Sequence, residues 1–194
     1  EANFRGVVLR HAQLQDASLK GANFSPTRPR GRVMRAEDGC NPNCQNADLS
    51  YADLYGANLT DANLTNANLT DANLTDANLT GANLTGANLT NANLGYANLT
   101  GANLYYANLT DANLYYANLT DANLTNANLT NAWLYYANLT GAYLNDADLT
   151  GAILTGADLT GAYLTGAVFC GTTMPDGSTD NSGCGGGGVA PGWQ

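Results

Sequence analysis

Asn46-Ala47-Asp48-Leu49-Ser50-Tyr51-Ala52-Asp53-Leu54 begins a run in which Ala, then Asn or Asp, then Leu returns every five residues. The run continues to Ala167-Val168-Phe169. Counting the apolar third residue of each unit from Leu49 to Phe169 gives 25 consecutive units with no change of phase. Self-similarity at a fixed period predicts a repeat architecture in which each unit packs on its neighbours.

A period of five fits neither an α-helix nor a flat strand. Five residues advance about 500° on a helix, so the Leu residues would not form a stripe. On a strand the side-chain period is two, so successive Leu residues would alternate between the two faces. The chain must therefore turn between units, and we expect a solenoid with Ala and Leu inside. The expected core positions include Leu49, Leu54, Leu59, Leu79, Leu99, Leu119, Leu139 and Phe169.

The A(N/D)LXX pattern resembles the pentapeptide-repeat proteins, and the resemblance covers about 150 of the 194 residues. It implies an all-β fold, the right-handed quadrilateral β-helix, with four pentapeptides in each square coil. Residues 20 apart would then stack, with Leu and Ala inside and the other three residues of each unit outside. With an inter-strand spacing of ~4.8 Å, the 25 units would make a rod of roughly 30 Å.

Four segments are expected along the chain. Residues 1–24 hold five looser units in the same phase, which predicts the first solenoid coils. Residues 25–44 contain three prolines and four arginines, which favours a loop leaving the side of the rod over a degenerate coil. Residues 45–170 form the main solenoid, and residues 171–194 form a Gly-rich tail that leaves it.

Charge is divided unevenly along the sequence. All seven Lys and Arg residues lie in residues 1–35, which carry a formal charge of +5, whereas the remainder carries −14. Such an uneven distribution of charge indicates that the protein interacts with partner molecules. The partner we expect is a second copy, stacked head to tail, and contacts of that kind can yield filaments. The loop arginines would also suit a phosphate or nucleic-acid patch, but a solvated loop pairing with nearby Asp residues is favoured.

The four cysteines permit three disulfide connectivities, and the local pairing joins Cys40 with Cys44 and Cys170 with Cys184. Four reduced, buried thiols are the alternative. A zinc site would need further ligands, and the only histidine, His11, is expected on the outer surface. The segment from Phe169 to Cys184 also resembles the tails of exported, cyanobacterial-type pentapeptide-repeat proteins, in which a terminal disulfide can bracket the coil end. Disulfides favour export. The sequence starts at Glu1 either because it was shortened or because a targeting segment was removed, and we favour removal, which also indicates export.

Aromatic residues fall into columns when residues 20 apart are stacked. Tyr96, Tyr116 and Tyr136 share one column, beside Tyr115 and Tyr135. Tyr143 and Tyr163 share another. These ladders are expected to stiffen the wall, and the alternative is a docking face for a glycan or a protein. Trp193, tethered by Gly185–Gly188, is expected either in a disordered terminus or docked on a neighbouring subunit.

The motif Asn-Leu-Thr forms a second surface pattern. Each copy is a formal acceptor for N-linked sugar, although the repeat alone would generate it. Neighbouring acceptors only ~4.8 Å apart could not all be filled. We also expect the asparagines to stack as a ladder of side-chain amides. The acceptor candidates are Asn58, Asn63, Asn68, Asn73, Asn78, Asn83, Asn88, Asn98, Asn108, Asn118, Asn123, Asn128 and Asn138.

The sequence gives no indication of an enzyme. It has one histidine with no nucleophile at a recognisable spacing, and no phosphate-binding loop. No apolar run is long enough to cross a membrane. We therefore expect no catalytic site, metal or cofactor, and a structural rod that associates end to end. The alternatives are a monomeric luminal or periplasmic scaffold and an acidic DNA mimic that inhibits DNA gyrase, as some members of the resembled family do.

Overall fold

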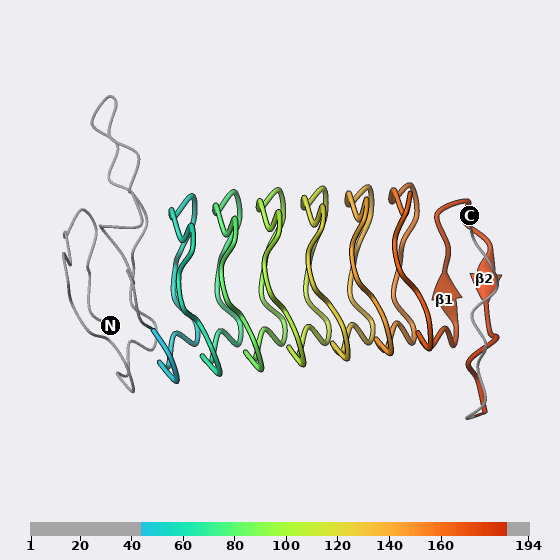
Figure 1. Ribbon diagram of the computed structural model, residues 1–194, viewed down its shortest axis with the longest axis horizontal. Helices are drawn as coiled ribbons and strands as arrows, with labels where there is room; N and C mark the ends of the chain where they lie inside the picture. Colours follow the sequence, from blue (N-terminus) through green and yellow to red (C-terminus); the bar gives the residue numbers. More distant parts are fainter. Residues whose placement is uncertain (1–43, 186–194) are drawn as a thin grey trace.

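The computed structural model describes residues 44–185, and Figure 1 shows them winding in successive coils along one axis. The predictions for residues 1–24 and 25–43 fall outside the described residues. So do those for His11, Cys40 and Trp193.

Each coil contains 20 residues. Every isolated β-bridge is parallel and joins residues 20 apart, from Asp48↔Asn68 to Ile153↔Thr173. Four pentapeptides therefore close one coil, as the repeat predicts. The coil has four sides, which we number by the central outward residue of each unit: side 1 contains Asn68, side 2 Asn73, side 3 Asn78 and side 4 Asn83.

Each corner is a tight turn that links two units. The N–H of Ala97 donates to the carbonyl of Leu94 at 3.0 Å, and the residue before Ala, here Tyr96, has a positive φ of 60°. Positive φ at the third residue is what a type II turn requires, and Gly and Asn supply it at low cost. The repeat satisfies this requirement with Asn, Asp or Gly at most corners.

The interior consists of the Ala and Leu of each unit, as predicted. Ala97 and Leu99 are fully buried, and the same holds along most of the coil. The backbone polar groups are satisfied between coils: the N–H of Leu99 donates to Asn118 O at 2.7 Å, and the N–H of Asn98 donates to Ala77 O at 2.9 Å. Each unit contributes only one Ala and one Leu to the core, so the repeated hydrogen bonds between coils are an important source of stability.

The two ends of the described coil depart from the simple repeat. Cys44 is fully buried and occupies the Leu position of a unit, with its N–H bonded to Asn63 O. At the other end, where a departing tail was expected, residues 172–175 continue the ladder through bonds from Leu154 N–H to Thr173 O and from Gly156 N–H to Pro175 O. Burial of Met174 explains why the coil extends beyond the last clear repeat.

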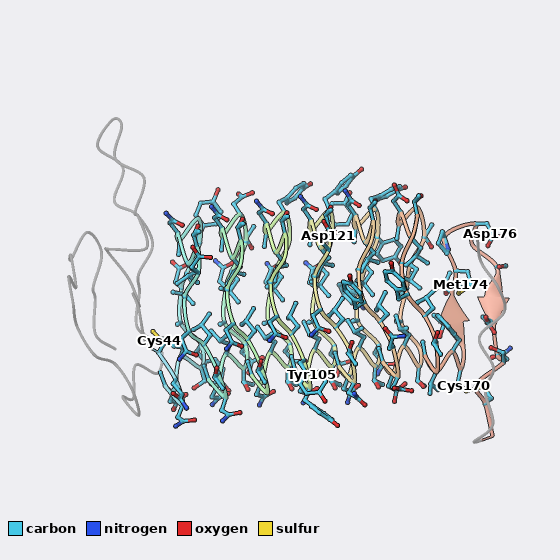
Figure 2. All side chains as sticks on the ribbon, viewed as in Figure 1. Cys44, Tyr105, Asp121, Cys170, Met174 and Asp176 are labelled. Carbon is cyan, nitrogen blue, oxygen red and sulfur yellow. A yellow bond between two sulfur atoms is a disulfide. The ribbon has the colours of Figure 1, made fainter. Side chains whose placement is uncertain are left out.

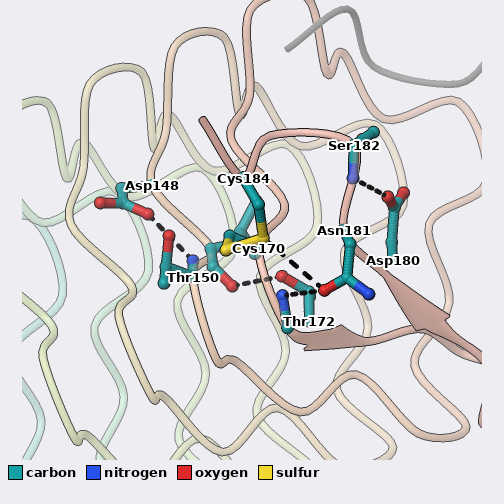
Figure 3. The surroundings of a disulfide bond; sticks show 10 residues. Asp148, Thr150, Cys170, Thr172, Asp180, Asn181, Ser182 and Cys184 are labelled. Carbon is teal, nitrogen blue, oxygen red and sulfur yellow. Dashed lines mark hydrogen bonds between the residues drawn. A yellow bond between two sulfur atoms is a disulfide. The ribbon is translucent and has the colours of Figure 1, made fainter. Parts of the chain in front are cut away.

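A short hairpin closes part of this end. Strand β1 (Thr172–Thr173) pairs antiparallel with β2 (Thr179–Asp180). Cys170 and Cys184 form a disulfide, and Asn181 Oδ1 accepts the N–H of Gly171 at 2.9 Å (Figure 3). The hairpin therefore covers Phe169 and Met174, which are both buried. Met174 lies at the end of the coil (Figure 2).

Candidate interaction surfaces

Sides 1 and 3, which face opposite directions, carry Asn followed two residues later by Thr in most coils. On side 3, Asn98 Oδ1 accepts both the N–H of Thr100 at 3.1 Å and its hydroxyl at 2.6 Å. The same pair of bonds recurs at Asn58, Asn78, Asn118 and Asn138. Each of these five acceptor motifs is therefore held in a local turn by its own threonine.

The expected ladder of stacked amides forms only in part. Asn113 Nδ2 donates to Asn93 Oδ1 at 3.1 Å, as that prediction requires. On side 1, however, Asn88 Nδ2 donates instead to Thr70 Oγ1 at 2.9 Å. The threonine two residues away competes successfully for the amide oxygen because it offers two donors within reach.

Sides 2 and 4 carry aromatic substitutions. Trp133 and Ile153 follow Asn113 along side 2, and Trp133 is 54% exposed. Tyr143 and Tyr163 stack on side 4 with ring centroids 4.8 Å apart. Trp133 is a surface residue that sequence reasoning missed. Its signal was the replacement of the outward Asn by Trp in Ala132-Trp133-Leu134.

The corner between sides 2 and 3 gathers the largest aromatic group. We call it the aromatic corner and define it as Tyr96, Tyr115, Tyr116, Tyr135 and Tyr136 with the adjacent Trp133. Tyr116 stacks on Tyr96 at 5.5 Å and on Tyr136 at 5.0 Å. Tyr115 meets Tyr116 edge to face at 4.5 Å. Because both faces of the Tyr116 ring are covered, the stack presents ring edges and hydroxyls to solvent.

The stacked tyrosines adopt an unfavourable backbone conformation. Tyr96, Tyr116 and Tyr136 have φ values of 60°, 54° and 56°. A bulky side chain with positive φ costs about 1–2 kcal/mol per residue. Stacking of each ring pair returns about 0.5–1.5 kcal/mol. Such strained residues cluster at sites of function, so this corner is a candidate binding surface.

Two exposed tyrosines, Tyr105 and Tyr115, have raised pKa values. Partial desolvation, followed by the neighbouring Tyr116, raises the pKa of Tyr115 above its usual value. A hydrogen bond with Tyr106 raises the pKa of Tyr105. Both phenols therefore stay protonated and can donate hydrogen bonds at neutral pH.

A third candidate surface is the C-terminal end of the coil, which the hairpin covers only on sides 1 and 2. Leu159, Ala162 and Leu164 are half-buried there, although their equivalents elsewhere are buried. The N–H groups of Leu159, Gly161, Leu164 and Gly166 have no hydrogen-bond partner within residues 44–185. This end is thus an exposed strand edge with an apolar lining, and such edges favour pairing with another chain.

The charged groups of the described rod are all carboxylates. Residues 44–185 contain twelve Asp and no Lys, Arg, His or Glu. Within the same residues, no group of three His, Cys, Asp or Glu could hold a metal ion, and no helix could cross a membrane.

Asp158 accepts hydrogen bonds from the Thr160 hydroxyl and N–H, which lower its pKa. Asp158 therefore remains charged at neutral pH.

The cysteines of the described residues are all oxidised. Cys170 pairs with Cys184, across 14 residues. Cys44 is also disulfide-bonded. Reduced thiols, the alternative left open by the sequence, do not occur at these three positions.

These features define a solenoid of pentapeptide repeats, and the comparisons with known proteins agree. The family model for pentapeptide repeats matches eight copies, over residues 1–25, 43–81, 67–105, 82–121, 102–135 and 132–171. The chain belongs to the pentapeptide repeat family, and its fold is the right-handed quadrilateral β-helix. No match was found among curated proteins.

Three solved structures illustrate the likeness. HetL from Nostoc sp. strain PCC 7120, a protein involved in heterocyst differentiation regulation, is 38% identical over 92% of this chain and 87% of its own, with a TM-score of 0.40. AT2G44920 from the thylakoid lumen of Arabidopsis thaliana is 29% identical over 58% of this chain and 83% of its own, with a TM-score of 0.52. Full-length QnrB1, a plasmid-mediated fluoroquinolone resistance protein, is 18% identical over 94% of this chain and 90% of its own, with a TM-score of 0.46.

Proposed function

We propose that this protein is an exported, non-enzymatic structural rod that associates end to end into filaments or a surface coat. The main support for this proposal is the C-terminal end of the coil, which the hairpin leaves uncovered on sides 3 and 4. Its uncovered sides present strand-edge N–H groups beside the half-buried Leu159 and Leu164. A further coil would bury these side chains and satisfy these donors, as successive coils do throughout the rod.

The hydrogen-bonding polarity of the coil favours head-to-tail contact. Toward the C-terminal end, each unit offers two donors and one acceptor: Leu99 and Gly101 donate, and Ala97 O accepts. Two C-terminal ends brought together would therefore have surplus donors. The N-terminal face of a coil offers the complementary set, because Asn118 and Thr120 supply carbonyls and Asn118 supplies one N–H. Residues 1–24 repeat this phase, so the start of a second copy suits the open end.

Charge supports the same arrangement. The first 35 residues carry +5 and the rest of the chain −14. Opposite charge at the two ends accelerates association and disfavours contact between like ends. The Cys170–Cys184 disulfide supports export, because disulfides persist in oxidising compartments.

Sugar attachment on side 3 extends the proposal. Asn58, Asn78, Asn98, Asn118 and Asn138 keep Oδ1 engaged with threonine, whereas their Nδ2 atoms donate to no residue within 44–185. Nδ2 is the atom that would carry a glycan. The mass of the intact chain from its natural source tests this step, and a mass equal to that of the bare chain would remove it.

A matched pair of variants tests the end-to-end proposal. Leu164→Lys places a charge in the open end, whereas Thr165→Lys places it on the exposed wall of the same coil. We expect the wild-type chain and Thr165→Lys to form fibres one rod wide by electron microscopy, and Leu164→Lys to remain short. Monodisperse single rods of the wild type at high concentration would instead support the monomeric scaffold.

A gyrase supercoiling assay tests the DNA-mimic alternative. Duplex DNA carries one charge per ~1.7 Å of axis, whereas Asp61 and Asp121 share a column three coils apart, with Gly81 and Gly101 between them. At ~4.8 Å per coil, these two carboxylates are separated by roughly 14 Å. We expect no inhibition, and inhibition at micromolar protein would favour the alternative.

A further inference from the structure

The aromatic corner has an unusual setting along its edge of the rod. In the column that contains Tyr96, Tyr116 and Tyr136, Asp76 precedes the tyrosines and Asp176 follows them after Gly156. Both carboxylates are exposed. Five coils separate Asp76 from Asp176, a distance of roughly 24 Å at ~4.8 Å per coil. The edge therefore offers an aromatic strip with an anionic group at each end.

The exposed parts of this strip suit an extended cationic segment. Trp133 is 54% exposed and pairs with no other aromatic ring within residues 44–185, so its ring is open to stacking. Arginine stacks on aromatic rings and pairs with carboxylates. Proline-containing segments dock on aromatic-lined surfaces because their polyproline II conformation is already extended. The hydroxyls of the tyrosine stack can donate to the carbonyls of such a segment.

The chain itself supplies a segment with this chemistry. Residues 25–35, Ser-Pro-Thr-Arg-Pro-Arg-Gly-Arg-Val-Met-Arg, contain two prolines and four of the seven cationic residues. In polyproline II conformation, Arg28 and Arg35 would be separated by roughly 22 Å, at about 3.1 Å per residue. This matches the spacing of Asp76 and Asp176. The described rod holds no cation of its own to compete for these carboxylates.

We propose that the aromatic corner binds the segment 25–35 of a second copy of this chain. The inference rests on the proposed end-to-end association, which brings the start of the second copy to the open end. Tyr116 lies 48 residues, or about 12 Å along the axis, from Leu164 at that end. Residues 1–24 of the docked copy would add about 6 Å, so the chain that follows them would begin about 18 Å from Tyr116. Residues 36–43 of that copy could span up to roughly 26 Å, which is enough to reach the corner.

Binding of a peptide to the full chain tests the corner separately from filament growth. The probe is a labelled peptide of residues 25–35, and its control carries Gln at all four arginine positions. The receptor is the full chain with Arg28, Arg30, Arg32 and Arg35 changed to Gln, so that its own segment cannot compete. We expect the probe to bind and the control peptide to bind at least about tenfold more weakly, because stacked and paired arginines supply the attraction. Absence of binding, or equal binding of the two peptides, would overturn the proposal.

Variants of the corner locate the binding surface. Tyr96, Tyr116 and Tyr136 are changed together to Asn, a residue that adopts the same positive φ at Asn91 and Asn131, so the fold is retained. The matched control changes Tyr143 and Tyr163 on side 4 to Asn, the residue at the equivalent position Asn123. We expect only the corner variant to lose at least about tenfold in peptide affinity. Equal loss in both variants, or loss in neither, would contradict the assignment.

Two further measurements separate this inference from the proposed function and fix the source of the segment. Leu164→Lys in the receptor chain should bind the peptide as tightly as the receptor itself does. In the wild-type chain the same change should prevent fibres, so the two proposals can fail independently. Chemical cross-linking of a mixture of isotopically light and heavy wild-type chains should join segment 25–35 of one chain to the aromatic corner of another. Cross-links confined to single chains would overturn the assignment to a second copy.

Discussion

The ring of Tyr136 lies over Gly156 of the next coil, so closely that a Cβ atom on Gly156 would come within 2.5 Å of ring atoms Cδ1 and Cε1. Gly156 also has a φ of +70°. This glycine therefore ends the tyrosine stack and meets two requirements at once, a left-handed backbone and an absent side chain.

Gly156→Ala should destabilise the protein more than the same change at Gly101. Gly101 has a similar φ of +63°, but no atom lies within 4 Å of the place that an added Cβ would occupy, so it isolates the backbone cost. We expect about 1 kcal/mol for Gly101→Ala and about 1–3 kcal/mol more for Gly156→Ala because of overpacking. Urea unfolding checks both values. Equal destabilisation would mean that the Tyr136 ring moves aside without cost.

The second prediction concerns the local turn in which Thr donates hydrogen bonds to the side chain of the Asn two residues before it. Thr100→Val keeps the branched shape but removes the hydroxyl that donates to Asn98 Oδ1 at 2.6 Å. We expect a loss of about 0.5–1.5 kcal/mol, the net value of one such hydrogen bond. The matched control is Thr125→Val, because the Thr125 hydroxyl donates no hydrogen bond within the described residues. A similar loss at both positions in urea unfolding would assign the effect to hydration of the wall instead.

The repeat predicts most of this architecture, because a 20-residue coil places every side chain once its phase is known. It predicts the buried Leu99, the column of Tyr96, Tyr116 and Tyr136, and the stacking of Tyr143 on Tyr163. These positions follow from the 20-residue register between coils. A shift of one residue in that register would move every side chain to a different position.

The unpredicted features depend on contacts that do not repeat. Continuation of the coil through Thr173 and burial of Met174 come from side chains that match no repeat unit. The half-open end depends on where the hairpin folds back, which the sequence pattern does not encode. The partner of each asparagine also could not be predicted, because amide and hydroxyl donors lie within similar reach of one oxygen.

Asp158 gives a prediction about pH. Hydrogen bonds from the Thr160 hydroxyl and N–H lower its pKa in the folded chain, so this interaction stabilises the fold above the ordinary Asp range. The stabilisation is lost as pH falls through the lowered folded pKa, below the ordinary value of about 4. Thr160→Val should raise the pKa of Asp158 toward that value. Carboxyl-carbon NMR titration measures it.

Asp176 provides the internal control for this titration. A hydrogen bond from the Ser178 hydroxyl lowers its pKa in the same way, but Ser178 is unchanged in the variant. The pKa of Asp176 should therefore stay low while that of Asp158 rises. A common rise at both residues would indicate a change in the overall field of the rod instead of loss of one hydrogen bond.

The Cys170–Cys184 disulfide makes the last prediction, which concerns the end of the coil. It closes a loop across 14 residues and holds the hairpin over Phe169 and Met174. A loop of this length contributes about 3 kcal/mol by restricting the unfolded chain. Replacing both cysteines by Ser should therefore loosen the last coil while leaving central coils intact, because repeat units interact mainly with their neighbours.

Amide hydrogen exchange locates this effect. The N–H groups of Leu154 and Gly156 are bonded to carbonyls of residues 173 and 175, so their exchange should accelerate in the double-Ser variant. The N–H of Leu94, which bonds Asn113 O at 2.7 Å inside the rod, is the control and should keep its protection. Equal acceleration at Leu94 would mean that the rod opens as one cooperative unit, and no acceleration at Leu154 would mean that β1 and β2 hold the end without the disulfide.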